Sequence, residues 1–262
     1  MQGIYLYRRF SLYPLEADME LARRVSGLIA RKLPVRPARL PVGRAVASIT
    51  FDDFPKSAWT QGGAILTRHG VRGTYYTAGG FCGRTMDATT YYDEADLREL
   101  LAAGHEIGCH GYGHQPTPDL ANAALAEDAR RNIQFLRPFT GQAVSYAFPF
   151  GAVSPRTKRF YAPRFASLRG VHPGVNQGRA DLAQLSTISL EERCFSRDTV
   201  DAAIARVKAA GGWLVFHTHD NGDAPSPYGT TPQKLDWTLA RVKAAGIDFL
   251  PMRDALGVVL AA

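Results

Sequence analysis

The sequence predicts an α/β fold built on a mainly parallel sheet, either open or closed. Two observations carry this prediction. Strand-like apolar runs alternate along the chain with segments of helical spacing. Several of these runs end in polar clusters, as strands of functional parallel sheets do at their carboxyl ends. The chain has 262 residues, of which 45% are apolar, which is enough for one sizeable core.

The first 44 residues are expected to form an appendage to this domain. Helical spacing runs from Glu16 to Leu33, and a proline-rich linker, LPVRPARLPVG, follows it. Residues 1–44 are therefore expected to be a basic N-terminal appendage, and residues 45–262 the main domain.

Beyond residue 44, strands and helices are expected to alternate. The segment 93–104 shows the clearest helix signals, because acids lie at its start and Gly104 ends it. Strands are expected over 46–51, 72–79, 105–110, 143–148, 165–170, 213–219 and 247–252, and helices over 57–70, 93–104, 119–141, 198–212 and 231–246.

Composition argues against several functions and locations. The net charge of +7 comes without a run of basic and aromatic residues, so nucleic-acid binding is not expected. Three widely spaced cysteines do not make a disulfide framework. The N-terminus has no signal-peptide pattern and no window is apolar enough to span a bilayer, which predicts a cytoplasmic protein. The basic, acid-free segment 23–44 is either a solvated lead-in or a contact with an anionic membrane face or a partner.

Two adjacent carboxylates, Asp52 and Asp53, end the first buried strand in the stretch ITFDDFP. They repel each other and are costly to bury unpaired, so a compensating group is expected. His110 and His114, in HGYGH, have a spacing that suits two metal ligands, although ordinary loop histidines share it. Two histidines and one aspartate would leave a coordination position open for catalysis. The second carboxylate could then accept a proton; a helix cap or turn acid is the alternative for this pair.

Two further motifs follow predicted strands. In HTHD (217–220), His217 and His219 point to one face of an extended strand, and a histidine there can protonate a leaving amine. A structural histidine is the alternative interpretation for one of the two. In FPFG (148–151), the turn either aims a backbone N–H at an oxyanion or simply ends the strand.

TFDD, HEIGCHGYGH, AFPFG and LVFHTHD occur in the order and approximate spacing of a known family. Over residues 45–255 the sequence resembles the polysaccharide deacetylases with a NodB homology domain, and RGTYYTAGGF (72–81) resembles their second strand. The resemblance implies a distorted (β/α) barrel of about seven strands and a catalytic domain over residues 45–262. It implies a hydrolase that removes N-acetyl groups from a sugar or polysaccharide precursor with the help of a divalent metal.

The resemblance also implies roles for particular residues. Asp52 matches the general base, the backbone N–H of Phe150 the oxyanion donor, and His219 the general acid, with His217 in reserve. Asp181 is the candidate for an aspartate that orients the acid. The implied metal ligands, for Zn²⁺ or alternatively Co²⁺, Ni²⁺ or Fe²⁺, are Asp53, His110 and His114.

Three positions depart from the family pattern. Ala147 stands where the family often has an arginine that braces the base, and Gly111 stands where a serine or threonine commonly follows the first metal histidine. The orienting aspartate has no clear match beyond Asp181. These departures make weak activity or an unusual substrate a stronger expectation than for a sequence that matches the family pattern in full.

The expected partner is an N-acetylated sugar or glycan precursor. The predicted location and the basic N-terminal segment favour a nucleotide-linked or lipid-linked precursor of a bacterial surface polysaccharide such as lipopolysaccharide. Tyr91 and Tyr92, and the turn-rich segment 223–232, are either part of the cleft rim or plain surface loops. Two alternatives stay open: a metal-dependent hydrolase of a non-sugar amide, and a catalytically silent glycan-binding module.

Overall fold

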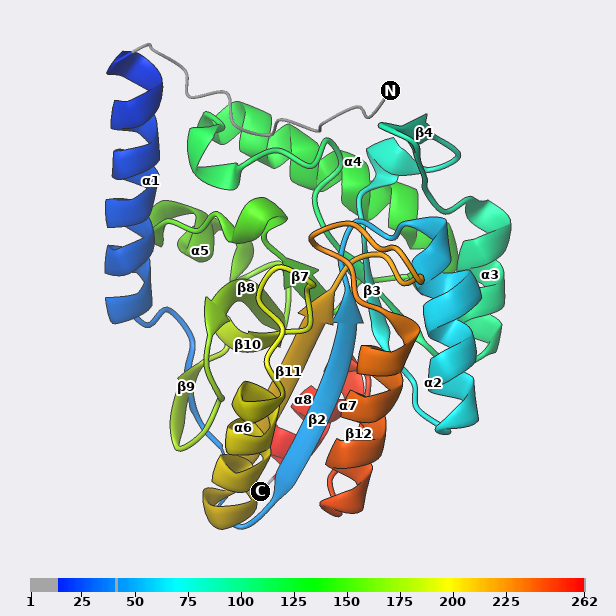
Figure 1. Ribbon diagram of the computed structural model, residues 1–262. Helices are drawn as coiled ribbons and strands as arrows, with labels where there is room; N and C mark the ends of the chain where they lie inside the picture. The colour runs from blue at the N-terminus through cyan, green and yellow to red at the C-terminus, as the bar shows by residue number, and fades with distance from the viewer. Residues whose placement is uncertain (1–13, 41, 262) are drawn as a thin grey trace.

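Seven parallel strands close into a barrel in the computed structural model, which describes residues 14–40 and 42–261 (Figure 1). Helices surround the barrel, so the predicted distorted (β/α) barrel is confirmed and the open sheet is not formed. Around the barrel the strands are β2 (Ala45–Phe51), β3 (Thr74–Thr77), β6 (Glu106–Cys109), β7 (Ser145–Ala147), β8 (Ser167–Pro173), β10 (Leu185–Ser189) and β11 (Gly212–Thr218).

The barrel closes where its first and last strands meet. β2 and β11 pair in parallel over their whole length, from Ala45 opposite Gly212 to Phe51 opposite Thr218. On its other side β2 has two partners, because β12 (Asp248–Phe249) pairs with its first half and β3 with its end. β2 is thus paired on both edges, and the burial of both its faces, with every residue from Val46 to Phe51 buried, explains its mainly apolar sequence.

Residues alternate between the barrel interior and the helical shell. On β2, Ala47, Ile49 and Phe51 belong to the large core between the barrel and the helices. The intervening residues face inward, where Ser48 accepts a hydrogen bond of 2.9 Å from the indole of Trp213 on β11. The same alternation places Asp52, the next residue in the inward series, at the carboxyl end of the barrel.

The helices of the outer layer begin and end at residues that cap them. Asp93 caps α3 by accepting bonds from Ala95 and Asp96, and Thr231 caps α7 by accepting from Lys234. The layer contains α2 (Ala64–Arg68) with the π-helical turn Ala58–Gly63 before it, α3 (Glu94–Ala102), α4 (Asn122–Thr140), α5 (Pro155–Tyr161), α6 (Arg197–Ala210) and α7 (Pro232–Ala244). Smaller elements are β4 (Thr85–Met86), β5 (Thr89–Thr90) and the 3₁₀ turns Gly79–Phe81, Thr117–Asp119 and Pro149–Gly151.

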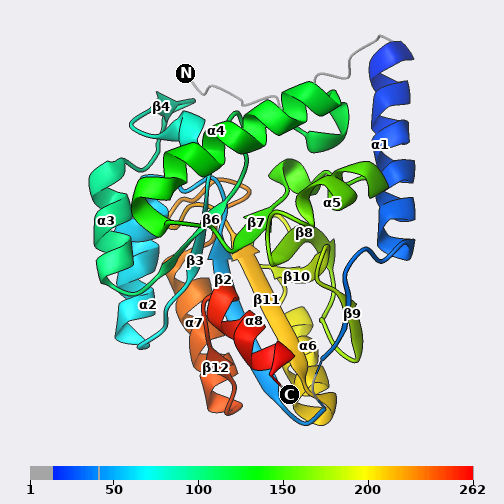
Figure 2. The same cartoon turned by 180° about the vertical axis from the view of Figure 1, so that it is seen from behind.

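A helix that the sequence did not predict packs against β2 and β11 on the side of the barrel seen in Figure 2. This is α8 (Met252–Leu260), so the prediction of a strand over 247–252 is wrong at its end. Its first backbone N–H groups donate to barrel side chains, Met252 to Thr74 and Arg253 to Glu106, at 2.9 Å each. A carboxylate is favourable at a helix N-terminus. Burial nevertheless raises the pKa of Glu106, which also accepts from Ser145.

The N-terminal segment packs on the barrel rather than standing clear of it. The predicted helix is present as α1 (Pro14–Lys32), and β1 (Pro37–Arg39) pairs antiparallel with β9 (Arg179–Asp181). Between them, the Arg36 guanidinium donates to the carbonyls of Phe165 and Ala166 at 2.7 and 2.8 Å. A domain boundary at residue 44 stays a prediction. The N-terminal part of that prediction, residues 1–13, lies outside the described residues.

Candidate active site

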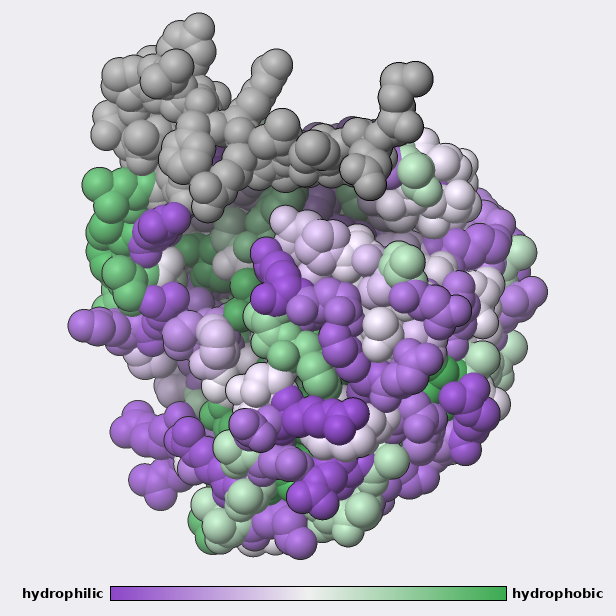
Figure 3. Space-filling view, viewed as in Figure 1, coloured by the Kyte–Doolittle hydropathy of each residue, from purple (hydrophilic) through white to green (hydrophobic). Residues whose placement is uncertain are grey.

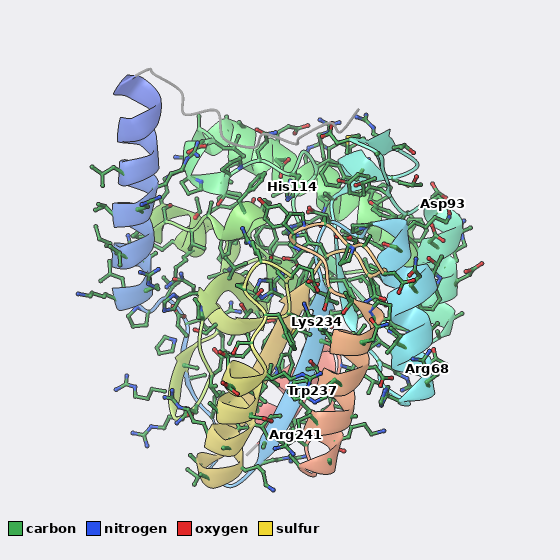
Figure 4. All side chains as sticks on the ribbon, in the orientation of Figure 1. Arg68, Asp93, His114, Lys234, Trp237 and Arg241 are labelled. Atoms are coloured by element: carbon green, nitrogen blue, oxygen red, sulfur yellow. The ribbon has the colours of Figure 1, made fainter. Side chains whose placement is uncertain are left out.

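The predicted site residues follow the carboxyl ends of barrel strands. Asp52 and Asp53 come directly after β2, His110 after β6, the turn Pro149–Gly151 after β7, and His219 after β11. In Figure 4, His114 lies above the strands, at the end to which the arrows of β2 and β11 point in Figure 1. Parallel strands bring their carboxyl ends to one rim, which is where sites of such barrels are found.

Asp53, His110 and His114 come together as predicted. One ligand atom from each lies within 4.8 Å of the others. The Asp53 Oδ1 atom is 3.3 Å from Nε2 of His110 and 2.8 Å from Nε2 of His114. Asp53 and His114 both have left-handed backbone conformations, with φ of 62° and 49°. Such strained conformations in non-glycine residues are typical of sites where the fold fixes a side chain for function.

The protonation pattern of this cluster fits a divalent cation. The His110 ring contacts the Ala147 carbonyl oxygen with Nδ1, at 2.8 Å. A carbonyl oxygen only accepts, so Nδ1 carries the proton and donates, and the lone pair of a neutral ring is on Nε2, facing Asp53. Asp53 Oδ1 is buried without a hydrogen-bond partner of good geometry among the described residues. Acceptor atoms that face one another in this way are what an open metal site with three protein ligands presents.

An aspartate on α4 holds the loop that carries the two histidines. Asp128 accepts hydrogen bonds from the backbone of Tyr112 at 3.0 Å and of Gly113 at 2.7 Å. Gly111 has a φ of +72°, and a Cβ atom there would lie 2.8 Å from the Asp128 carboxylate. A serine or threonine would not fit this loop. The missing hydroxyl of residue 111 is therefore replaced by a carboxylate brace that the sequence did not reveal.

The base candidate Asp52 is paired with a buried arginine. Arg169 of β8 is fully buried, and its Nη2 contacts Oδ1 of Asp52. Burial raises the pKa of Asp52, but the charge of Arg169 and the neighbouring histidines outweighs burial and lowers it to about 2. Arg169 lies directly opposite Ala147 in the pairing of β7 with β8. The basic group that the family often carries at position 147 is thus supplied here by the next strand.

Of the two histidines that are candidates for the general acid, His219 lies nearer the three candidate metal ligands. Its Nε2 is 4.0 Å from Oδ2 of Asp53, and its Nδ1 is 3.2 Å from the carbonyl oxygen of Tyr228. His217 is buried in the barrel interior, and burial lowers its pKa. Glu191, just after β10, touches both rings: its Oε1 is 3.5 Å from Nε2 of His217 and 3.6 Å from Nδ1 of His219.

Asp181 is not brought to this site. It lies on β9, where it pairs with the fully buried Lys158 and accepts from the backbone of Val35 and Arg36 at 3.1 and 2.8 Å. Glu191 occupies the position beside His219 that was predicted for Asp181. Burial raises the pKa of Glu191, but the contacts with His217 and Arg193 outweigh burial and lower the pKa to about 2. This carboxylate is therefore ionised.

Aromatic side chains lie beside two histidines of the rim, His114 and His219. Phe150 is 66% exposed and its ring centroid lies 4.5 Å from that of His114. Its backbone is left-handed, with a φ of 57°, in the turn after β7. Tyr228, in the segment 223–232, is half exposed and its ring centroid lies 5.7 Å from that of His219.

Of the two tyrosines in the segment 86–93, only Tyr91 can contribute to the rim. It packs on Phe81, which in turn contacts His114. Tyr92 is fully buried, stacks on Phe54 and donates to the Ala78 carbonyl, so it is neither a rim residue nor part of a surface loop, and both interpretations are wrong for it.

The fold and this site define a parallel α/β barrel with a candidate metal site made of two histidines and one aspartate. A model of the family described as polysaccharide deacetylase matches residues 39–163, which contain Asp52, Asp53, both ligand histidines and Phe150. A chitin deacetylase from Pestalotiopsis sp is 25% identical over 128 residues, which cover 46% of this chain and 41% of that protein. The chain thus matches less than half the length of that relative.

Solved structures show the same fold. A structure from Mycobacterium smegmatis assigned to the polysaccharide deacetylases has a TM-score of 0.62 at 19% identity, with 87% of this chain and 95% of that one covered. A family 4 acetyl xylan esterase from Clostridium thermocellum, in complex with a cobalt ion, has a TM-score of 0.58 at 17% identity, with 81% and 91% covered. Over residues 39–163 the chain is thus similar to the polysaccharide deacetylase family, as the sequence motifs predicted.

Proposed function

We propose that the protein is a metal-dependent hydrolase that removes N-acetyl groups from a sugar or a glycan precursor. The observation that carries the proposal is the combination of three convergent ligand atoms with an ionised, arginine-paired Asp52 and with His219 on one barrel rim. The family match supports the reaction class. The cobalt ion bound to the Clostridium esterase supports a divalent metal.

Asp53, His110 and His114 would hold the metal. Bound there, a divalent cation such as Zn²⁺, or alternatively Co²⁺, Ni²⁺ or Fe²⁺, would act as a Lewis acid toward the acyl oxygen and lower the pKa of water. The ligand set of two imidazoles and one carboxylate suits each of these ions, which leaves the choice to metal availability.

The other residues would move protons and hold charge. Asp52 has its pKa held at about 2, so it is ionised near neutral pH and can accept a proton from the attacking water. The backbone N–H of Phe150 would donate to the developing oxyanion. His219 would protonate the nitrogen as the carbon–nitrogen bond breaks, giving acetate and a free amine. His217 faces the barrel interior, so it is the weaker candidate for the acid.

The exposed aromatic rings of Phe150, beside His114, and of Tyr228, beside His219, support the binding of a sugar ring at this rim. A role in bacterial surface-glycan synthesis, on a nucleotide-linked or lipid-linked precursor, stays a prediction. So does a cytoplasmic location, with which the free thiols of Cys82, Cys109 and Cys194 are consistent. Contact of segment 23–44 with a membrane also stays a prediction. Among the helices that the structure describes, none is long and apolar enough to cross a bilayer.

Metal content and turnover, measured together, test the proposal. We expect about one divalent metal per chain in the wild type and loss of it in His110→Ala. Asp52→Asn should keep the metal and lose acetate release from N-acetylated sugars. Wild-type metal content in His110→Ala would disprove the ligand assignment.

The same assay separates the two alternatives. A non-sugar amidase would release acid from simple N-acyl amides and leave chito-oligosaccharides and N-acetylated sugar nucleotides intact. A silent module would bind glycans in the metal-loaded state without turnover. The intact Asp52, with its own buried arginine, favours an enzyme, because a binding module has no use for an ionised base beside a metal.

A further inference from the structure

The helix α1 exposes a row of large apolar side chains and buries the small Ala30. Leu21, Val25, Leu28 and Ile29 recur at the spacing of one helix face and are 46–61% exposed. On the opposite face, Ala30 is fully buried against the barrel domain. An amphipathic helix on a globular protein ordinarily has the reverse orientation, with its apolar face inward. This outward stripe, named here the α1 stripe, comprises Leu21, Val25, Leu28 and Ile29.

Contacts on the inner face fix this orientation. Lys158 of α5 is completely buried and donates to the carbonyl oxygens of Ala30 at 2.7 Å and Leu33 at 3.0 Å. Arg23 donates to Asp119 at 2.9 Å. Rotating α1 to bury the stripe would break these bonds; Lys158 would keep its ion pair with Asp181 but lose both carbonyl acceptors, and unmade hydrogen bonds of a buried charged group are costly. The stripe is therefore held outward by the fold.

Nothing in the described part of the chain covers the stripe. Figures 1 and 2 show α1 at the edge of the molecule, with α5 on its inner side. Figure 3 shows hydrophobic side chains along the same edge. Contiguous exposed apolar side chains of this kind mark an interaction surface.

The charge pattern of α1 indicates what the stripe binds. By its place in the sequence, one acidic residue of the first half of α1, Asp18, falls on the helix face of the stripe, and so does one basic residue at its end, Lys32. In an antiparallel pair of two copies, the acidic position of each helix would lie opposite the basic position of the other. Asp18 and Lys32 lie seven residues before and seven after Val25. A twofold axis at Val25 would therefore bring Asp18 of one copy to Lys32 of the other at both ends of the stripe.

We propose that the α1 stripe is the interface of a homodimer, in which the α1 helices of two copies pack antiparallel about a twofold axis near Val25. An anionic membrane is the less suitable occupant, because the acidic residue on the face of the stripe, Asp18, would oppose it. A 19-residue helix is about 28 Å long. One such helix pair buries less than the roughly 800 Å² per partner of a standard interface, so a dissociation constant on the order of micromolar is expected. The proposal does not depend on the proposed enzymatic function.

Sedimentation of the full chain across about 1 to 100 µM tests the proposal, since this range brackets the expected dissociation constant. The wild type should pass from monomer to dimer. Val25→Asp should be monomeric throughout, whereas Leu260→Asp, a matched change at a 53% exposed leucine of α8, should dimerise like the wild type. Circular dichroism checks that both variants are folded. A wild type that stays monomeric, or a dimer that Val25→Asp leaves intact, overturns the proposal.

A charge exchange tests the antiparallel arrangement itself. Lys32→Glu should weaken the dimer at least about fivefold, since it places two acids together at both ends of the helix pair. Adding Asp18→Lys should restore the wild-type dissociation constant. A double variant weaker than the single one would overturn the antiparallel register. Binding of a monomeric wild type to vesicles of phosphatidylcholine and phosphatidylglycerol, lost in Val25→Asp, would assign the stripe to a membrane instead.

Discussion

Asp52 at the end of β2 and Arg169 of β8 form a buried ion pair, and Arg169 lies in register with Ala147 of the neighbouring strand β7. Guanidinium and carboxylate thus meet in the barrel interior although the position where the family often has arginine holds alanine. Removal of one partner of a buried pair leaves the other uncompensated, which costs about 3–5 kcal/mol. The pair therefore controls both stability and the ionisation of the proposed base.

An arginine placed at position 147 should restore the kcat that is lost when Arg169 is removed. We expect Arg169→Ala to lower kcat by about tenfold or more and to destabilise the protein by about 3 kcal/mol. The double variant Ala147→Arg with Arg169→Ala should regain most of the lost kcat, because the two positions are neighbours in the sheet. Steady-state kinetics and urea unfolding measure the two effects. If the double variant recovers stability and no kcat, Arg169 has only a structural role.

Glu191→Gln should slow catalysis without loss of metal. The change keeps the size of the side chain but removes the negative charge beside His219, so protonation of the leaving amine should become slower, by about tenfold. Glu192→Gln is the control, since Glu192 is the next residue and pairs with Lys234 at 2.6 Å, away from the histidines. Acetate release and elemental analysis of both variants check the prediction. Equal rates in the two variants would remove Glu191 from the mechanism.

The Gly111 position should tolerate no side chain. We expect Gly111→Ser to weaken metal binding by about tenfold or more, because the new Cβ would meet the Asp128 brace and shift the histidine loop. Gly141→Ala is a matched control, as Gly141 also has a positive φ, of 66°, but has open space where a Cβ would lie. Both variants should lose about 1 kcal/mol of stability from backbone strain. Competition with a metal-sensitive dye measures the metal affinity of each variant, which should be lowered in Gly111→Ser only. Similar metal affinities in the two variants would contradict the role of the Asp128 brace.

Asp181 should contribute to stability at neutral pH and not to turnover. Burial raises its pKa, but the contact with Lys158 and the backbone donors outweighs burial, so the pKa lies below its usual value. A carboxylate with a lowered folded-state pKa stabilises the protein above its unfolded pKa of about 4 and loses this contribution as pH falls further. Asp181→Asn should thus be about 3 kcal/mol less stable than the wild type at pH 7.

Urea unfolding at several pH values measures this difference, which should shrink as the pH falls below about 4. Asp236→Asn, which removes a carboxylate paired with Arg68 and His69 at the surface, should change stability little. A constant difference between wild type and Asp181→Asn down to pH 3 would contradict the role of its charge.

Most of the barrel was predictable from the sequence because its long elements have strong periodicity. The runs 46–51 and 213–219 became β2 and β11, and the segment 119–141 contains α4. Short elements were missed. β10, with the sequence LSTIS, has too few apolar residues to distinguish it from a loop, and α8 begins directly after a strand without a polar cap residue.

The three residues of the candidate metal site could be brought together from the sequence because they lie in short motifs at strand ends. Arg169 could not, since SLRG does not show that the side chain faces the barrel interior or which residue of β7 lies beside it. Glu191 was missed together with β10, whose end it follows. A carboxylate directly after a strand, as in SLEE, was the only signal available for it.

The pairing of β2 with β11 makes the first strand of the barrel depend on the last. During synthesis β2 leaves the ribosome long before β11 does, so one of its edges stays unpaired until nearly the whole chain has emerged. Closing contacts between such distant segments is slow, and an exposed strand edge invites pairing with other chains. His219 joins the candidate metal ligands only when β11 is in place. Folding and the assembly of the proposed active site should therefore be one late event, and chains truncated before residue 212 should aggregate rather than retain partial activity.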